Sequence, residues 1–189
     1  MGRLEDAVKC YRQAGEIAVQ LQDQMKEGLR RSNLANTLIN LQCHDEARRE
    51  LLRAIECKQP YGHAAEPWKT WAILCDLEQA TGQPQAAAEA RARARQSYLA
   101  YRRDSGENYD IGAQVCAAVV QALAAGQSDA LAQQLTGMLA TEDHPRANAL
   151  LPHLLAILGG AREAARADDP ALTYLDAVEL QLLLERLGN

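Results

Sequence analysis

Three asparagines, Asn33, Asn36 and Asn40, follow one another at spacings of three and four residues. On an α-helix, residues at these spacings lie on one face. An amide side chain offers both a donor and an acceptor, so a row of amides can pair with a peptide backbone whatever side chains that peptide carries. The sequence therefore contains a candidate surface for holding an extended polypeptide segment.

Residues that could hold a metal or catalyse a reaction are scattered, without the spacings that such sites need. The five cysteines form no CxxC pair and are odd in number, which favours free thiols in a reducing cytosol. The four histidines match no standard zinc pattern, and Gly159-Gly160 lacks the Lys and Ser or Thr of a phosphate-binding loop. We predict no enzyme activity, no catalytic residue, no metal and no cofactor. The enzymatic alternative is a site within residues 105–189, where a deep pocket would have to gather ionisable side chains.

The charged clusters have simpler interpretations than catalysis. The carboxylate pairs Glu142-Asp143 and Asp168-Asp169 each precede an expected helix, where negative charge stabilises the positive end of the helix dipole. A basic run lies along an expected helix over residues 85–103 and comprises Arg91, Arg93, Arg95, Arg102 and Arg103. We interpret this run as a solvated face paired with acidic residues, and an anion or phosphopeptide patch is the alternative.

Composition favours an all-α protein. The apolar residues are mostly Ala and Leu, with no Phe, a mixture typical of closely packed helices, and strand signals are scarce. The net charge of −5, with both signs interspersed, argues against a nucleic-acid surface. No apolar run approaches the ~20 residues needed to cross a bilayer, and no leader opens the chain. We therefore expect no nucleic acid and no membrane as partners, and a cytoplasmic location.

A period of forty residues runs through the first half of the chain. Ala7, Ala47 and Ala87 are forty residues apart, and Ala14, Ala54 and Ala94 keep the same step. An Ala seven residues after another Ala lies two turns along the same helix face, where its small size lets a neighbouring helix approach. Apolar stretches with helical spacing precede the second and third copies, at residues 28–41 and 66–80. The repeating unit is therefore expected to be helix, short turn, helix.

These units resemble tetratricopeptide repeats. Gly2, Ala7, Tyr11 and Ala14 fit the pattern of the second helix of such a repeat, and later copies keep most of it as Ala47, Leu51 and Ala54 and as Gly82, Ala87 and Ala94. Trp71 and Leu74 match the first-helix pattern. The period exceeds the usual length of about 34 residues, and the extra residues at 16–27 and 56–65 resemble the extended repeats of the kinesin light chain type. The resemblance implies a superhelix of helical hairpins over residues 1–104, followed by a helical C-terminal cap.

The resemblance also implies where a partner would bind, because the first helices of such hairpins line a concave face whose exposed positions hold the ligand. The positions that match are Leu29, Ser32, Asn33, Asn36 and Asn40 in one repeat, and Lys69, Ala72, Ile73, Asp76 and Gln79 in the next. Asn33-Leu34-Ala35 resembles the kinesin light chain type, in which the Asn holds an extended peptide. Clamping of a C-terminal carboxylate, known in some members, is not expected, because Ile73 replaces a basic residue of that clamp.

The predicted function is a protein–protein interaction module whose groove binds an extended peptide or partner protein. The alternative is a sensor or oligomerisation arm of a larger signalling protein. Gly2 falls almost at the start of a second helix, so we expect either a preceding segment in a longer protein or another chain over the open N-terminal end, which includes a homo-oligomer. The sequence does not identify the partner, the biological process or the oligomeric state.

Beyond residue 104 the forty-residue match fails, but the chain is still expected to be helical. Candidate helices span residues 111–125, 129–139, 145–158 and 170–187, the last with Asp169 as its cap and Pro170 at its first position. We expect degenerate repeats or a cap over residues 105–189, and a separate small helical domain is the alternative.

Overall fold

The computed structural model describes residues 2–141 and 144–188, and over these ranges the chain forms helices and no strand. The all-α prediction is confirmed. The chain divides into two compact units, Met1–Tyr101 and Arg102–Asn189, close to the boundary expected after residue 104. Among the described residues no helix is both long and apolar enough to cross a membrane. The carboxylates Glu142 and Asp143, expected to precede a helix, lie outside the described residues.

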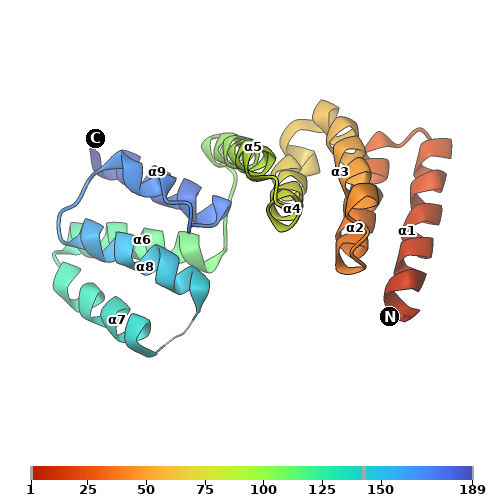
Figure 1. The fold of residues 1–189 in the computed structure, drawn as a ribbon. Coiled ribbons are helices and arrows are strands. Elements are labelled where there is room, and N and C mark those ends of the chain that lie inside the picture. The colour runs from red at the N-terminus through yellow and green to blue at the C-terminus, as the bar shows by residue number, and fades with distance from the viewer. Residues whose placement is uncertain (1, 142–143, 189) are drawn as a thin grey trace. The chain divides into compact units, whose positions relative to one another are not determined.

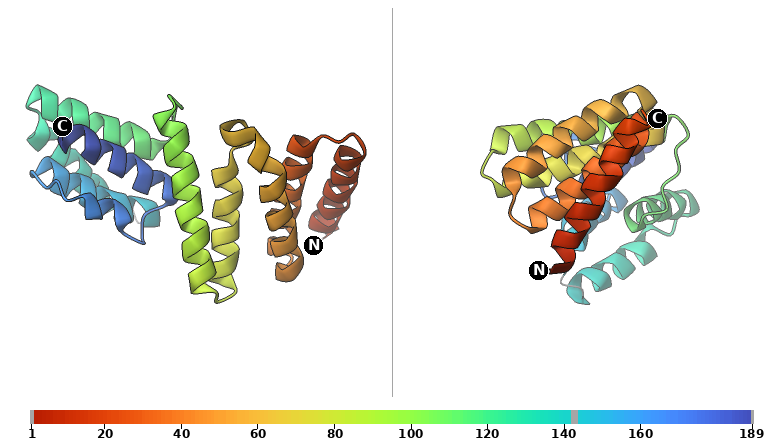
Figure 2. Two further views of the ribbon diagram at one scale, coloured as in Figure 1. Left: turned by 90° about the horizontal axis from the view of Figure 1, so that it is seen from above. Right: turned by 90° about the vertical axis from the view of Figure 1, so that its right-hand side faces the viewer.

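The first unit is a row of helices that pack in chain order (Figures 1 and 2). Its elements are α1 (Gly2–Gln20), α2 (Gln24–Asn40), α3 (His44–Lys58), the 3₁₀ segment η1 (Gln59–Ala65), α4 (Pro67–Ala80) and α5 (Pro84–Arg103), of which Arg102 and Arg103 belong to the second unit. α1 packs on α2, α2 on α3, and α3 on α4. The ring of Trp68 in α4 lies 5.7 Å from that of Tyr98 and 4.7 Å from that of Tyr101, which joins α4 to α5.

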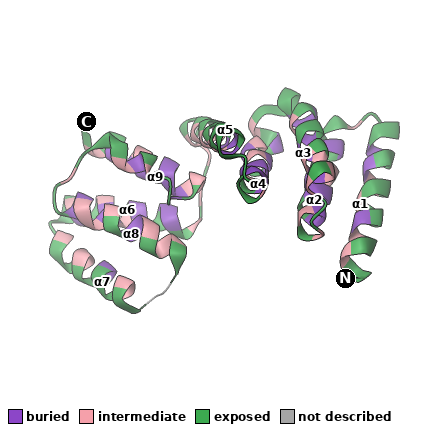
Figure 3. Ribbon diagram, in the orientation of Figure 1, coloured by how far each residue is buried: buried purple, intermediate pink, exposed green. Residues whose placement is uncertain are grey.

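The periodic alanines lie in helix-packing positions. Ala47, Ala54, Ala87 and Ala94 are all buried, on the side of α3 and α5 that meets neighbouring helices (Figure 3). The alanines of the first copy, Ala7 and Ala14, are only half-buried. The difference follows from packing, since α1 packs chiefly against α2 whereas α3 packs against both α2 and α4.

Three turns of the first unit end a helix in the same way. Gln22, Gln42 and Gly82 have positive φ angles of 56°, 59° and 71°. In each turn the N–H of the next residue donates to the carbonyl five residues back, as from Cys43 to Leu38 at 2.9 Å. This geometry satisfies carbonyls at the helix end. Only three residues separate α1 from α2, so the extra residues at 16–27 lie mostly within these two helices.

The second unit gathers its helices around one core. Its elements are α6 (Ile111–Ala125), α7 (Ser128–Thr141), α8 (Pro145–Leu158), the 3₁₀ segment η2 (Ala164–Asp168) and α9 (Tyr174–Gly188). α6 contacts α7, α8 and α9. The fully buried residues at the centre come from α6, α8 and α9, namely Val119, Leu154, Ile157, Ala177 and Leu180. The predicted bounds of α6 and α8 agree with the structure.

The predicted start of the last helix is wrong. Asp169 accepts from the backbone N–H of Ala171 at 2.8 Å, and its carbonyl accepts from Leu172, so this segment closes a turn and does not begin a helix. α9 begins four residues after Pro170. Thr173 Oγ1 accepts from the N–H of Asp176 at 3.1 Å and donates to the carboxylate of Asp176 at 2.7 Å. This Thr caps the helix in place of Asp169.

Candidate functional site

A hollow of about 440 Å³ lies between α2, η1 and α4 of the first unit. It is lined by Met25, Lys26, Leu29, Ser32, Asn33, Lys58, Ala64, Ala65, Glu66, Lys69, Thr70 and Ile73. Five of the ten predicted groove residues are among them: Leu29, Ser32 and Asn33 from α2, and Lys69 and Ile73 from α4. Two helices that are forty residues apart in the repeat thus contribute facing sides of one concavity.

The remaining predicted residues do not line this hollow. Asn36 and Asn40 are exposed on α2 beyond it, and Asp76 and Gln79 are exposed on α4. Ala72 is half-buried. The amide row therefore starts at the hollow, where Asn33 is half-buried, and continues along the solvent-facing side of α2.

Ser32 differs from its prediction as an exposed groove residue, because it is only 5% exposed. Its hydroxyl donates to the carbonyl of Gly28 at 3.0 Å and lies 3.0 Å from Thr70 Oγ1. Since the single hydroxyl proton of Ser32 is used on Gly28, Thr70 donates to Ser32. A side chain held in this way forms part of the floor of the hollow and not its rim.

Lys58 and Thr70 complete this floor, and the sequence did not identify them. Lys58 Nζ donates to Thr70 Oγ1 at 2.8 Å, and both residues are buried. A Lys in the last turn of a helix is ordinarily interpreted as complementing the helix dipole, so no sequence signal marks Lys58. What turns it inward is the close approach of α2 to α3 at Gly28, where an added Cβ would lie 2.9 Å from Lys58 Cγ and 3.1 Å from the carbonyl of Ala54.

The lysines of the hollow differ in how they are compensated. Lys26 pairs with Asp23 at 2.8 Å, and Lys69 pairs with Glu66 at 2.6 Å. In the part of the chain that the structure describes, Lys58 has no carboxylate partner. Burial lowers the pKa of the Lys58 ammonium. To a smaller extent, the nearby Glu66 carboxylate raises this pKa and the Lys69 ammonium lowers it. The hollow therefore has one buried cation whose charge is not compensated by an ion pair.

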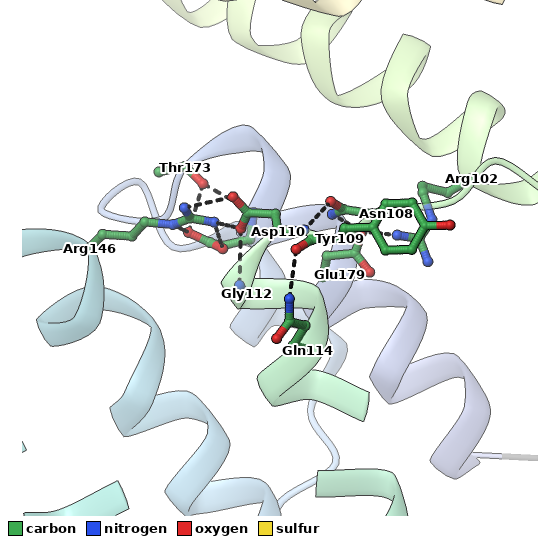
Figure 4. Close-up of polar contacts among 10 residues, drawn as sticks. Arg102, Asn108, Tyr109, Asp110, Gly112, Gln114, Arg146, Thr173 and Glu179 are labelled. Atoms are coloured by element: carbon green, nitrogen blue, oxygen red, sulfur yellow. Dashed lines mark hydrogen bonds and ion pairs between the residues drawn. The ribbon is translucent and has the colours of Figure 1, made fainter. Parts of the chain in front are cut away.

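A compact group of ionisable side chains surrounds a buried carboxylate, Asp176, in the second unit (Figure 4). The guanidinium of Arg146 donates to both carboxylate oxygens of Asp176 at 2.7 Å and also contacts Asp110. Asp110 in turn caps α6 by accepting from the N–H of Gly112 at 3.0 Å, and Thr173 donates to Asp176. Arg146 thus connects the first turns of α6, α8 and α9. These groups satisfy one another, which is the arrangement of a structural cluster.

A second polar group is visible in the same close-up (Figure 4). Glu179 accepts from Asn108 Nδ2 at 2.9 Å and pairs with Arg102. Next to this group along the chain, Arg103 pairs with Glu185. Arg102 and Arg103 are the last residues of the predicted basic run, and both pair with acidic residues as interpreted. Arg103 does so at the surface, whereas the side chains of Arg102 and Glu179 are only 14% and 6% exposed, so this end of the run is not a solvated face throughout. Within residues 2–141 and 144–188, no group of three metal-ligating side chains occurs.

Acid should weaken the second unit through Asp110. Hydrogen bonding from Arg146 lowers the pKa of Asp110 below its usual 3.8. A carboxyl group whose pKa is lower in the folded state stabilises the fold when ionised, so this contribution is complete at neutral pH. It is lost as the pH falls from about 3.8 through the lower pKa of the folded state. Denaturant unfolding followed by circular dichroism at pH 7 and pH 3 should show a smaller acid-induced loss of stability in Asp110→Asn than in wild type. An equal loss in the two proteins would contradict the prediction.

The chain matches no protein-family model, no curated protein and no solved structure. Its function is therefore inferred from its own residues.

Proposed function

We propose that this chain is a protein–protein interaction module of the tetratricopeptide type, which binds an extended segment of a partner along α2 and α4. The observation that supports this most is the hollow between these helices, lined by Asn33 and Lys69, with the amide row continuing from it. The forty-residue period and the chain-order packing of the helices agree with stacked hairpins. The superhelix itself is part of this proposal.

The dimensions of the amide row suit an extended peptide. Asn33 and Asn40 are seven residues apart, which is about 10.5 Å along a helix axis at 1.5 Å per residue. An extended chain rises about 3.3 Å per residue, so the row spans roughly three residues of the ligand. Each amide can donate to one backbone carbonyl and accept from one backbone N–H. Recognition of this kind depends on backbone conformation more than on ligand sequence.

The alternative function as an oligomerisation arm is favoured by one feature of α1 and the turn after it. Ile17, Val19 and Leu21 are 54%, 49% and 69% exposed, an unusual concentration of apolar surface near one helix end. Light scattering coupled to size exclusion, on wild type and on Ile17→Ser/Leu21→Ser, tests this alternative. A wild-type dimer that the double substitution converts to a monomer would support it, and a wild-type monomer would contradict it.

The binding function is tested with peptides selected against the wild-type protein from a random phage-displayed library. Asn33→Ala/Asn36→Ala should weaken the selected peptides by about tenfold to a hundredfold, because each lost hydrogen bond is worth about 0.5–1.5 kcal/mol. Affinity is measured by isothermal titration calorimetry, and thermal unfolding checks that the fold is intact.

The matched control is Asn148→Ala, an exposed Asn on α8 of the second unit, which should leave affinity unchanged. Peptides that bind the Asn33→Ala/Asn36→Ala protein as tightly as wild type would contradict the assignment of this groove. The same conclusion would follow if no peptide could be selected.

A further inference from the structure

Lys58 is a buried cation whose ammonium has no carboxylate in direct contact among the described residues. The residue is 5% exposed, and within the described ranges the hydroxyl of Thr70 is the only partner of its ammonium. An ammonium has three N–H donors, so two of them are unused by the protein. Buried charges in proteins are ordinarily paired or bound to a ligand, since leaving one uncompensated costs several kcal/mol.

The groups that surround Lys58 in the described structure hold its ammonium by a hydrogen bond and not by an ion pair. Its Thr70 partner is fully buried and is itself committed to Ser32, which is committed to Gly28. This relay fixes the position of the ammonium at the floor of the hollow. Lys58 also lines the hollow, so the residue borders the space that an occupant would fill.

The charge balance of the lining indicates what that occupant carries. Lys26 and Lys69 are each paired with a carboxylate of their own, so the hollow has one uncompensated positive charge. One cation matches a monoanion such as a carboxylate, whereas a dianionic phosphate would leave an excess negative charge next to Glu66. A buried amine–carboxylate contact of this kind is a strong, charge-assisted hydrogen bond.

We propose that the hollow receives the side-chain carboxylate of an Asp or Glu in the bound segment, with Lys58 as its contact at the floor and Asn33 and Lys69 at the rim. This inference rests on the proposed peptide-binding function and specifies one residue of the ligand. The exposed amides Asn36 and Asn40 continue the binding surface beyond the hollow along α2. The bound segment therefore extends past the position that enters it.

The experiment uses small probes, so that it does not depend on finding a peptide. The first probe is N-acetyl-L-glutamate methylamide, whose only charge is its side-chain carboxylate. The matched neutral probe is N-acetyl-L-glutamine methylamide, and N-acetyl-L-alanine presents a terminal carboxylate instead. Inorganic phosphate is the fourth probe. Each is titrated into the full chain and followed by NMR, with the Lys58 side-chain methylene and the Thr70 and Ser32 amides as reporters.

Blocked glutamate should shift these reporters in a saturable way, and the other three probes should bind at least about tenfold more weakly, the size expected for losing one charged hydrogen bond. Lys58→Met should weaken the binding of blocked glutamate by at least the same factor. Methionine has nearly the volume of the lysine stem and removes a buried charge, so this variant is expected to fold. The wild-type shift of the Lys58 methylene tests the contact without any variant.

Equal binding of blocked glutamate and blocked glutamine would overturn the proposal, as would unchanged binding to Lys58→Met. Preference for acetyl-alanine would overturn the choice of a side chain, and preference for phosphate would overturn the choice of a monoanion. The proposed peptide-binding function can fail independently of this site. If blocked glutamate binds at Lys58 but the selected peptides bind the Asn33→Ala/Asn36→Ala protein as tightly as wild type, the carboxylate site stands and the groove assignment is wrong. The reverse result would keep the groove and remove the site.

Discussion

Replacing Arg146 by methionine is expected to destabilise the second unit by about 3–5 kcal/mol, the cost of breaking a buried ion pair from one side. The side chain of Asp176 is only 1% exposed, and Arg146 supplies two of its hydrogen bonds. Without the guanidinium, this carboxylate remains buried with Thr173 as its side-chain donor. Asp110 would lose the same partner, and the starts of α6, α8 and α9 would lose their common connection.

The measurement can assign the loss to the correct unit. Both tryptophans, Trp68 and Trp71, lie in α4, so tryptophan fluorescence reports the first unit, whereas far-ultraviolet circular dichroism reports both. In urea, Arg146→Met should move the circular dichroism transition of the second unit to lower concentration. The control is Arg166→Met, because its partner Glu163 is 65% exposed, and an ion pair with an exposed partner contributes little to stability. Equal effects of the two substitutions would show that the Arg146 cluster does not stabilise the unit.

Gly112→Ala is expected to destabilise the second unit by about 3 kcal/mol, the upper part of the usual range for overpacking. In a helix this substitution ordinarily stabilises by up to about 1 kcal/mol. At this position, however, the added methyl group would overlap Oδ1 of Asp176 and lie 3.1 Å from Nη2 of Arg146. Either the methyl group or the ion pair must move, and Asp176 is almost fully buried.

Gly137→Ala, in α7, is the matched comparison because an added Cβ there meets no atom within 4 Å. It should stabilise the protein by up to about 1 kcal/mol through helix propensity alone. Thermal unfolding of the two variants beside wild type should therefore give shifts of opposite sign. Shifts of the same sign would mean that the contact of α6 with Asp176 and Arg146 does not constrain the backbone.

Helix positions were largely predictable because their signals are local. The bounds of α6 and α8 follow from Asp110 and Gly126, and from Pro145 and Gly159, which cap or interrupt helices through their own backbone preferences. The forty-residue step of the alanines likewise identified faces that are buried in α3 and α5. The positive φ angles of Gln22 and Gln42 were not predicted, because Gln has no preference for this backbone region.

The candidate site was predictable in part. The row of Asn33, Asn36 and Asn40 is a property of one helix, and the pairing of α2 with α4 across the hollow follows from the repeat. Ser32 was expected to be exposed and is buried, because the approach of Thr70 from α4 covers it. Its neighbour Asn33 stays at the rim of the same hollow.

The sequence by itself therefore determined that this protein is helical, where most helices begin and end, and which small residues face a neighbouring helix. Those properties depend on residues a few positions apart, whose geometry the helix imposes. Only the tertiary structure decided that Lys58 is buried beneath Ser32 and Thr70, and that Arg146 connects Asp110 with Asp176. Such contacts join residues 12 to 38 positions apart, and they depend on how closely whole helices approach, as at Gly28 and Gly112, which no local pattern specifies.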